Sequence, residues 1–160
     1  MGDGDGWVQC ADGHRHWGRH GAAGLLLSGG DRVVLQHRSL NTHEGGTWGL
    51  PGGARDSHED VVQTALREAE EEAAIGAASV RPIAVSVADH GGWSYATVLA
   101  EAIAEIRPHA ANWESDEVRW WARQEVAQLP LHPGLAATWT ALQAPASALT
   151  VVVDGANVVG

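Results

Sequence analysis

The chain has 160 residues, the size of one compact domain, and its single cysteine, Cys10, cannot form an internal disulfide, which fits a cytoplasmic protein. The net charge is −10 and all ten permanently cationic residues are arginines, so the chain lacks the surplus of cations that general nucleic-acid binding requires. No stretch approaches the roughly 20 apolar residues that span a bilayer, and the N-terminus lacks the pattern of a signal peptide.

The first part of the chain predicts two β-hairpins and a glycine-rich loop. Asp12-Gly13 is a two-residue turn signal within residues 7–20. A second hairpin is expected from the apolar runs at 24–27 and 32–37. Residues 40–56 contain five glycines and are expected to form a loop.

The second part predicts two helices among several strands. The clearer helix covers residues 57–75, and a second covers Leu135 to Leu142, buried through Leu135, Trp139 and Leu142. Strands are expected at residues 83–88, 94–106 and 118–122. Because strands outnumber helices, the pattern favours the α/β class, with a mixed sheet flanked by helices.

Residues 144–160 are expected to lie outside the main domain, which covers residues 1–143. Ala144 to Ala148 have the composition of a linker. The segment from Val151 to Gly160, within an apolar run that begins at Leu149, resembles the opening strand of a PIN/NYN-type nuclease domain. Ten residues are too few to make that domain, so the chain is either a fragment of a longer two-domain protein or ends in a simple terminal strand.

Three glutamates share one face of the helix predicted at 57–75, for which Ser57 is the expected N-cap. Glu68, Glu71 and Glu72 are spaced i, i+3 and i+4. Like charges at this spacing cost roughly 0.2–0.5 kcal/mol per pair, and the nearby negative end of the helix dipole adds to that cost. The helix alone fits two interpretations equally well: a solvated acidic face, or ligands of a divalent cation.

The segment from Gly53 to Ile75 resembles the Nudix box, G-x5-E-x7-R-E-U-x-E-E-x-G-U, in which U is an aliphatic residue. The resemblance covers 23 consecutive residues and every charged position of the motif. It departs at Ala74, where the family has glycine, and Gly76 is expected to end the helix instead. This resemblance favours the metal-ligand interpretation of the acidic helix.

The resemblance implies a Nudix-type α/β/α sandwich with a mixed β-sheet and a loop–helix–loop catalytic motif. It also implies hydrolysis of a phosphoanhydride bond in a nucleoside di- or triphosphate derivative with Mg²⁺, for which Mn²⁺ is expected to substitute. The implied metal ligands are the carbonyl of Gly52 and the carboxylates of Glu68, Glu71 and Glu72.

Five charged residues are the catalytic candidates that the resemblance implies: Glu59, Arg67, Glu68, Glu72 and Glu114. Glu59 is expected to orient Arg67 or a water molecule, and Arg67 to hold the carboxylates by ion pairing. Glu68 is the first choice for the general base. Glu114, six residues before Trp120, is the second choice, because many Nudix enzymes supply a further carboxylate from a late loop; an ordinary surface glutamate is an equally good interpretation.

Arg38 and Trp48 precede the motif and are the candidate substrate-binding residues. Trp48 is expected either to stack on a nucleobase or to pack in the core beside the loop. The signals of other Nudix subfamilies are missing around residues 89–93, which leaves the MutT-like branch and (d)NTPs, including oxidised ones, as the expected substrates. The alternative is a catalytically inactive nucleotide- or RNA-binding Nudix module attached to a downstream nuclease domain. A homodimer is also expected, because Nudix relatives are often dimers.

Overall fold

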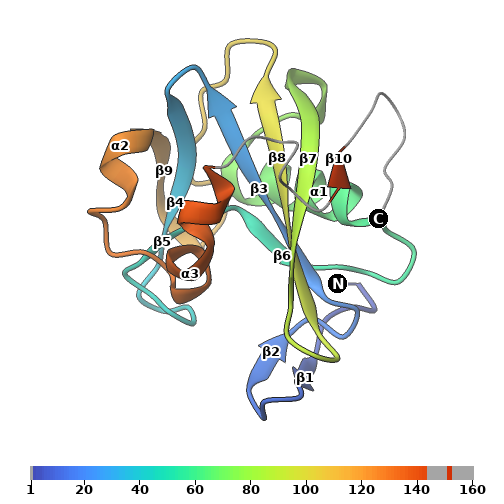
Figure 1. Ribbon diagram of the computed structural model, residues 1–160. Coiled ribbons are helices and arrows are strands. Elements are labelled where there is room, and N and C mark those ends of the chain that lie inside the picture. Colours follow the sequence, from blue (N-terminus) through green and yellow to red (C-terminus); the bar gives the residue numbers. More distant parts are fainter. Residues whose placement is uncertain (1, 144–150, 153–160) are drawn as a thin grey trace.

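The computed structural model describes residues 2–143 and 151–152 and is built on an eight-stranded mixed sheet (Figure 1). The central strand, β3, pairs in parallel with β8 and antiparallel with β4 and β6. The strands of this sheet are β3 (Ala22–Gly29), β4 (Arg32–Arg38), β5 (Trp48–Gly49), β6 (Gly52–Ala54), β7 (Val80–Asp89), β8 (Ser94–Ala102), β9 (Ser115–Ala122) and β10 (Val151–Val152).

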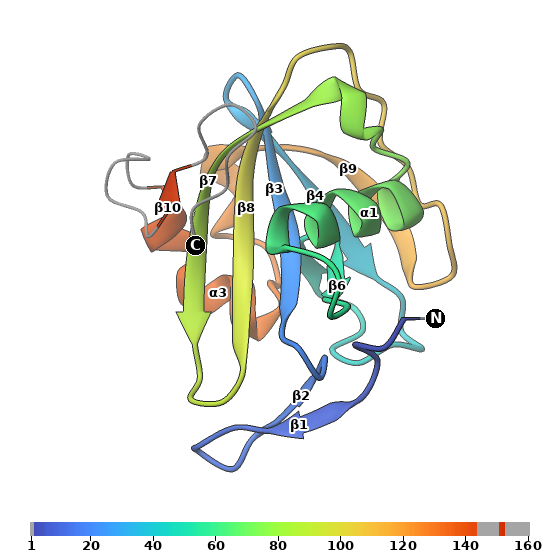
Figure 2. The ribbon, with the colours of Figure 1, turned by 90° about the vertical axis from the view of Figure 1, so that its right-hand side faces the viewer.

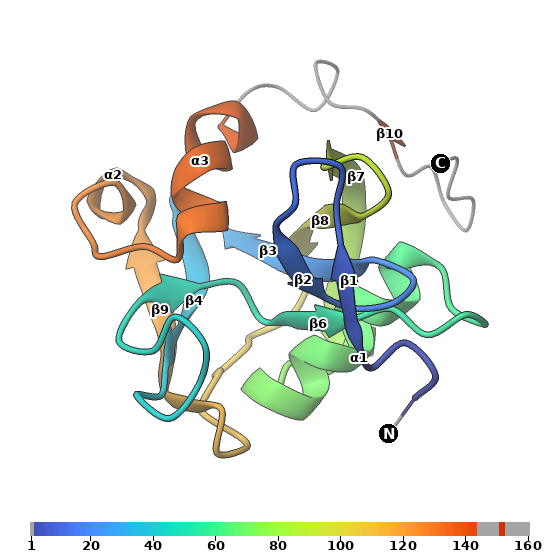
Figure 3. The same ribbon diagram turned by 90° about the horizontal axis from the view of Figure 1, so that it is seen from below.

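Helices cover both faces of the sheet, because the central strand β3 carries apolar side chains on both faces. Leu25 and Leu27 on β3 pack on one face with α1 (Val61–Ala73), and Leu26 packs on the other with α3 (Pro133–Leu142). A strand buried on both faces carries a continuous apolar run rather than an alternating one. Figures 2 and 3 show the sheet between these helices. The predicted α/β/α sandwich with a mixed sheet is confirmed.

The helix α1 begins and ends at residues other than those predicted. Asp60, not Ser57, is the N-cap, and its side chain accepts a hydrogen bond from the backbone N–H of Gln63. The N–H of Ser57 instead donates to the Asp3 carboxylate, at 2.8 Å. At the C-terminal end Ala74 itself adopts the left-handed conformation, with φ 57°, and its N–H donates to the Glu70 carbonyl.

The expectation that Gly76 ends α1 is therefore wrong. Gly76 has a φ of −73° and precedes a short 3-10 helix, η1 (Ala77–Ser79). The chain leaves α1 two residues earlier, at the position where the Nudix motif has glycine, so the requirement for a left-handed residue belongs to the fold and persists when alanine is present.

The face opposite α1 holds a second core built around α3. The predicted burial of Leu135, Trp139 and Leu142 is confirmed, and they pack with Leu26 and Val33 from the sheet. The sequence did not predict α2 (Arg123–Val126), a single turn that follows β9 and buries Val126 in the same core. Among the described residues, no helix is long and apolar enough to cross a membrane.

Both predicted hairpins are confirmed. The first consists of β1 (Trp7–Gln9) and β2 (Arg15–Trp17), with Trp7 opposite Trp17, and it projects from one end of the sandwich (Figure 1). The second is formed by β3 and β4 around a turn at Gly30-Asp31.

Other boundaries differ from the predictions. The predicted loop at 40–56 contains β5 and β6, and the strand predicted at 94–106 ends at Ala102. The strand predicted at 118–122 is the second half of β9. In the tail, β10 pairs antiparallel with β7, whereas the linker predicted at 144–148 and the rest of the PIN/NYN-like segment lie outside the described residues.

Candidate active site

The glycines of β6, just before α1, pass close to the backbone of β3 and to the carboxylate of Glu68. A Cβ on Gly53 would lie 2.6 Å from the Glu68 carboxylate carbon, and one on Gly52 would lie 2.5 Å from the Ala23 carbonyl oxygen. The N–H of Gly52 donates to Glu72 Oε2 at 3.1 Å. The glycine-rich loop therefore brings backbone groups directly against the acidic half of α1.

Glu72 is the most buried acid of the site, with a relative exposure of 2%. Burial, a hydrogen bond with Glu114 and the charge of Glu68 together raise the pKa of Glu72. Glu114, at the end of a loop remote in sequence, thus acts on the pKa values of both Glu72 and Glu68. The structure thus brings together three of the carboxylates that were the sequence candidates.

Glu68 lies next to Glu72 in a similar environment. Burial raises the pKa of Glu68 to about 7, although the neighbouring charge of Arg67 opposes this; the charges of Glu71 and Glu114 act in the same direction as burial. Glu71 is more accessible, with 55% of its side chain exposed, and lies 3.5 Å from Arg67 Nη1. The crowded carboxylates are short of positive charge, which is the condition that a divalent cation relieves.

Arg67 forms hydrogen bonds with Glu59, with Glu68 and with the backbone before α1. Its Nε and Nη2 donate to the two carboxylate oxygens of Glu59 at 2.7 and 2.9 Å, and its Nη1 donates to Glu68 Oε1 at 2.9 Å. Nη2 also donates to the Ala54 carbonyl at 3.1 Å. The hydrogen bonds from Arg67 are the largest influence that lowers the pKa of Glu59, to about 2. Arg67 therefore links Glu59, which it binds through both carboxylate oxygens, to Glu68 on α1.

A second group of potential ligands, Asp56, His58 and Glu59, has ligand atoms within 4.8 Å of one another. Its acids are already engaged. Glu59 accepts hydrogen bonds from Arg67, Thr64 and the Asp56 backbone, and Asp56 accepts one from the Gly4 N–H. Glu68 and Glu72 form the other candidate cation site: their pKa values are raised by burial and by neighbouring acids, whereas Arg67 holds the pKa of Glu59 low.

Trp48 is a buried residue. Its relative exposure is 7%, and it packs edge-on against Trp121 with 5.1 Å between ring centroids. The burial favours the alternative of a core tryptophan beside the loop, and a stacking role for Trp48 stays an untested prediction. Apolar burial outweighs exposure of the indole at this position, because α3 and β9 close over it.

Arg38 lies at the end of β4, and its Nε donates to the His43 carbonyl at 2.8 Å. Burial and the charge of Glu72 raise the pKa of Tyr95, and the positive charge of Arg38 lowers it by a smaller amount. Arg38 and Glu72 thus act on the Tyr95 hydroxyl with opposite charges, which extends the site from the carboxylates toward β4.

Sequence reasoning missed two residues that contact this region. Tyr95, on β8, lies over Gly24, where a Cβ would overlap the tyrosine hydroxyl. Gln36, on β4, donates from Nε2 to Glu72 Oε2 at 3.3 Å. The one available signal was the polar Gln36 directly after the apolar run Val33 to Leu35, since a glutamine is rarely buried in a strand without a partner.

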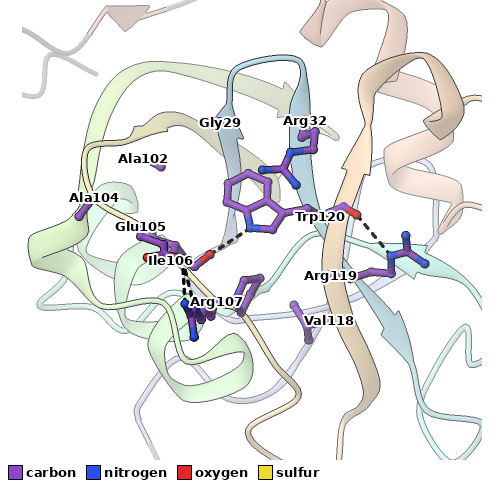
Figure 4. A pocket seen from close by; sticks show the side chains of 11 residues that line it. Gly29, Arg32, Ala102, Ala104, Glu105, Ile106, Arg107, Val118, Arg119 and Trp120 are labelled. Carbon is purple, nitrogen blue, oxygen red and sulfur yellow. Dashed lines mark hydrogen bonds and ion pairs between the residues drawn. The ribbon is translucent and has the colours of Figure 1, made fainter.

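A cavity of about 510 Å³ lies at the other end of β9 and contains none of these residues (Figure 4). Its polar groups are largely paired: the Trp120 indole donates to the Ile106 carbonyl at 3.1 Å, and Arg107 pairs with Glu105 at 3.1 Å. This cavity is therefore not the candidate active site, which we place at the carboxylates of Glu68, Glu72 and Glu114.

The sandwich, the glycine loop and the glutamate-bearing helix define a hydrolase of the Nudix class. The NUDIX domain family model matches residues 18–142. The chain belongs to the Nudix family and is a Nudix hydrolase.

Individual relatives agree with this assignment. A Mycobacterium tuberculosis (strain ATCC 25618 / H37Rv) protein named "Putative 8-oxo-dGTP diphosphatase 3" is 53% identical over 158 residues, covering 91% of this chain and 72% of that protein. The crystal structure of a Nudix hydrolase from M. smegmatis, RenU, superimposes with a TM-score of 0.81 at 47% identity, covering 88% of this chain and 93% of that chain. A MutT Nudix hydrolase from Burkholderia pseudomallei has a TM-score of 0.60 at 28% identity, covering 78% of this chain and 95% of that chain.

Proposed function

We propose that the chain is a Mg²⁺-dependent pyrophosphohydrolase that cleaves a phosphoanhydride bond of nucleoside triphosphates, with oxidised (d)NTPs as the leading substrates. The observation that carries this proposal is the convergence of Glu68, Glu72 and Glu114, with the pKa values of Glu68 and Glu72 raised. The name of the M. tuberculosis relative, an 8-oxo-dGTP diphosphatase, supports the choice of substrate.

The donor set suits Mg²⁺, with Mn²⁺ as a substitute, because both prefer oxygen ligands. The Gly52 carbonyl and the carboxylates of Glu68, Glu71 and Glu72 would hold the cation. When bound, it neutralises phosphate charge and lowers the pKa of a water molecule. The acidic chain itself offers few cations to the triphosphate, and Arg38 stays a candidate substrate-binding residue.

Glu68 is the first candidate for the general base, and Glu114 is the second. Arg67 holds Glu68 Oε1 at 2.9 Å, which orients the carboxylate. The attacking water loses a proton to this base while its oxygen bonds to phosphorus. The bond from phosphorus to the bridging oxygen breaks, and the leaving phosphate group departs with that oxygen.

The experiment is a turnover assay on a panel of nucleotides with Mg²⁺, including dGTP, 8-oxo-dGTP, ADP-ribose and diadenosine tetraphosphate. Release of pyrophosphate, rather than phosphate, identifies the bond cleaved. Glu72→Gln should abolish turnover, whereas Glu70→Gln, on an exposed position of the same helix, should retain it. Tight nucleotide binding by the unaltered chain without any turnover would instead establish the inactive binding module.

A further inference from the structure

Gln36 is a fully buried polar residue in the row of β4 side chains that faces α1. Its relative exposure is 0%, and Val34 on the same face and Val118 on the neighbouring strand belong to the apolar core. Burying an amide among apolar side chains costs free energy unless its polar atoms are hydrogen-bonded. A leucine or valine would fill this position without that cost, so the amide needs a specific explanation.

One half of the explanation is the contact with Glu72. Gln36 Nε2 donates to Glu72 Oε2 at 3.3 Å, and the Gly52 N–H donates to the same oxygen at 3.1 Å. Two donors from different strands therefore fix one oxygen of the carboxylate. Neither donor contacts the second oxygen, which stays available to the carboxylate cluster.

The other half is an atom without a partner. Gln36 Oε1 is buried and accepts no hydrogen bond among the described residues. When Glu72 is ionised, as a metal ligand must be, only Nε2 can donate to its carboxylate, and this fixes the orientation of the amide. Since both amide atoms share one carbon, Oε1 lies close to the Glu72 carboxylate and still needs a hydrogen-bond donor.

We propose that Gln36 is a positioning residue of the metal site. Its Nε2 orients Glu72 toward the cation, and its Oε1 accepts a hydrogen bond from a water molecule at the carboxylate cluster. The inference rests on the proposed function, because it assigns Glu72 to the metal. It adds a residue from β4, outside the helix motif, on which metal affinity depends.

The test measures Mn²⁺ binding to the whole chain without substrate, by the electron paramagnetic resonance signal of free Mn²⁺. Gln36→Met removes both polar atoms at similar volume. We expect it to weaken Mn²⁺ binding roughly 10- to 100-fold, the usual effect of removing a group that orients a metal ligand. Turnover should recover at saturating Mn²⁺, with the nucleotide KM unchanged once the metal site is filled.

Two further variants separate the possible results. Ser115→Ala removes another buried, unpartnered polar atom and should leave Mn²⁺ affinity unchanged. Glu72→Gln should lose most of the affinity, and if it does not, the proposed metal site is itself wrong. If Glu72→Gln loses affinity and folded Gln36→Met binds Mn²⁺ within about twofold of the unaltered chain, only the role of Gln36 is overturned.

A measurement on the unaltered chain covers the case in which Gln36→Met does not fold. The side-chain amide of Gln36 is fully buried, so its ¹H–¹⁵N signals should outlast those of exposed glutamines after transfer to D₂O. Adding diamagnetic Mg²⁺ should shift these protected signals. Protected glutamine signals that do not move as the site fills would overturn the proposal.

Discussion

The pair of Glu59 and Arg67 allows a quantitative test of how the site is supported. We predict that Glu59→Gln destabilises the protein and does so much less in acid than at neutral pH. The pKa of Glu59 is lowered from 4.5 to about 2, mainly by hydrogen bonds from Arg67. At about 1.4 kcal/mol per unit, this difference corresponds to roughly 3 kcal/mol. Because 32% of the Arg67 side chain is exposed, solvent screening reduces our expectation to about 2 kcal/mol.

The pH dependence has a defined sign. A carboxylate whose folded pKa is lowered contributes stability that is complete above its unfolded pKa, here 4.5, and that is lost as the pH falls through about 2. The difference between the unaltered chain and Glu59→Gln should therefore be full at pH 7. At about pH 3 the difference in stability between the two proteins should fall to less than half of its value at pH 7.

The assay is urea unfolding of both proteins across this pH range, without metal. Glu70→Gln is the matched control, because it replaces an exposed glutamate of the same helix and should change stability by no more than about 0.5 kcal/mol. A destabilisation by Glu59→Gln that is the same at neutral and acid pH would refute the reasoning. It would mean that the loss comes from side-chain packing and not from the charge of Glu59.

Three further predictions concern the site and its borders. Burial raises the pKa of Glu68 to about 7, so the metal-free chain should lose stability as the pH rises from 4.5 through 7, and Mg²⁺ should abolish this loss. A thermal unfolding temperature of the metal-free chain that does not change over this pH range would contradict the prediction. Ala74→Gly should stabilise the protein by about 0.5–1 kcal/mol in urea unfolding, because glycine relieves the left-handed strain but has a more flexible unfolded state. Trp48→Ala should cost about 3–5 kcal/mol of stability, as for other core tryptophans. The folded Trp48→Phe variant should keep the nucleotide KM within about twofold of the unaltered chain. A large rise in its KM with unchanged stability would support the stacking role instead.

Local spacing predicted the acidic part of the site, because one helix fixes its geometry. Residues three and four apart share a face of a helix whatever the rest of the chain does, so Glu68, Glu71 and Glu72 had to lie together. The capping residue was less predictable. Ser57 and Asp60 are both good caps, and the choice depends on Asp3, far away in sequence, which takes the N–H of Ser57.

The rest of the site depends on pairing between distant strands, which one sequence does not reveal. Gln36 meets Glu72 only because β4 lies beneath the second half of α1, and Tyr95 reaches the site only because β8 pairs with β3 beside Gly24. Trp48 was ambiguous for the same reason. Its neighbours Trp121 and Leu135 come from later elements, and these decide that it is buried.

The distribution of charge around Arg67 supports placing the proposed cation at Glu68 and Glu72 rather than at Asp56, His58 and Glu59. Arg67 is divided between the two groups: Glu59 takes a bidentate pair, and Glu68 takes a single hydrogen bond. One guanidinium can stabilise Glu59 fully, and the low pKa of that acid shows that it does. Within the described part of the chain, Arg67 makes one hydrogen bond to Glu68 and no ion pair with Glu72, and the pKa values of both acids stay raised. In the proposed function, a divalent cation supplies the positive charge that Glu68 and Glu72 lack.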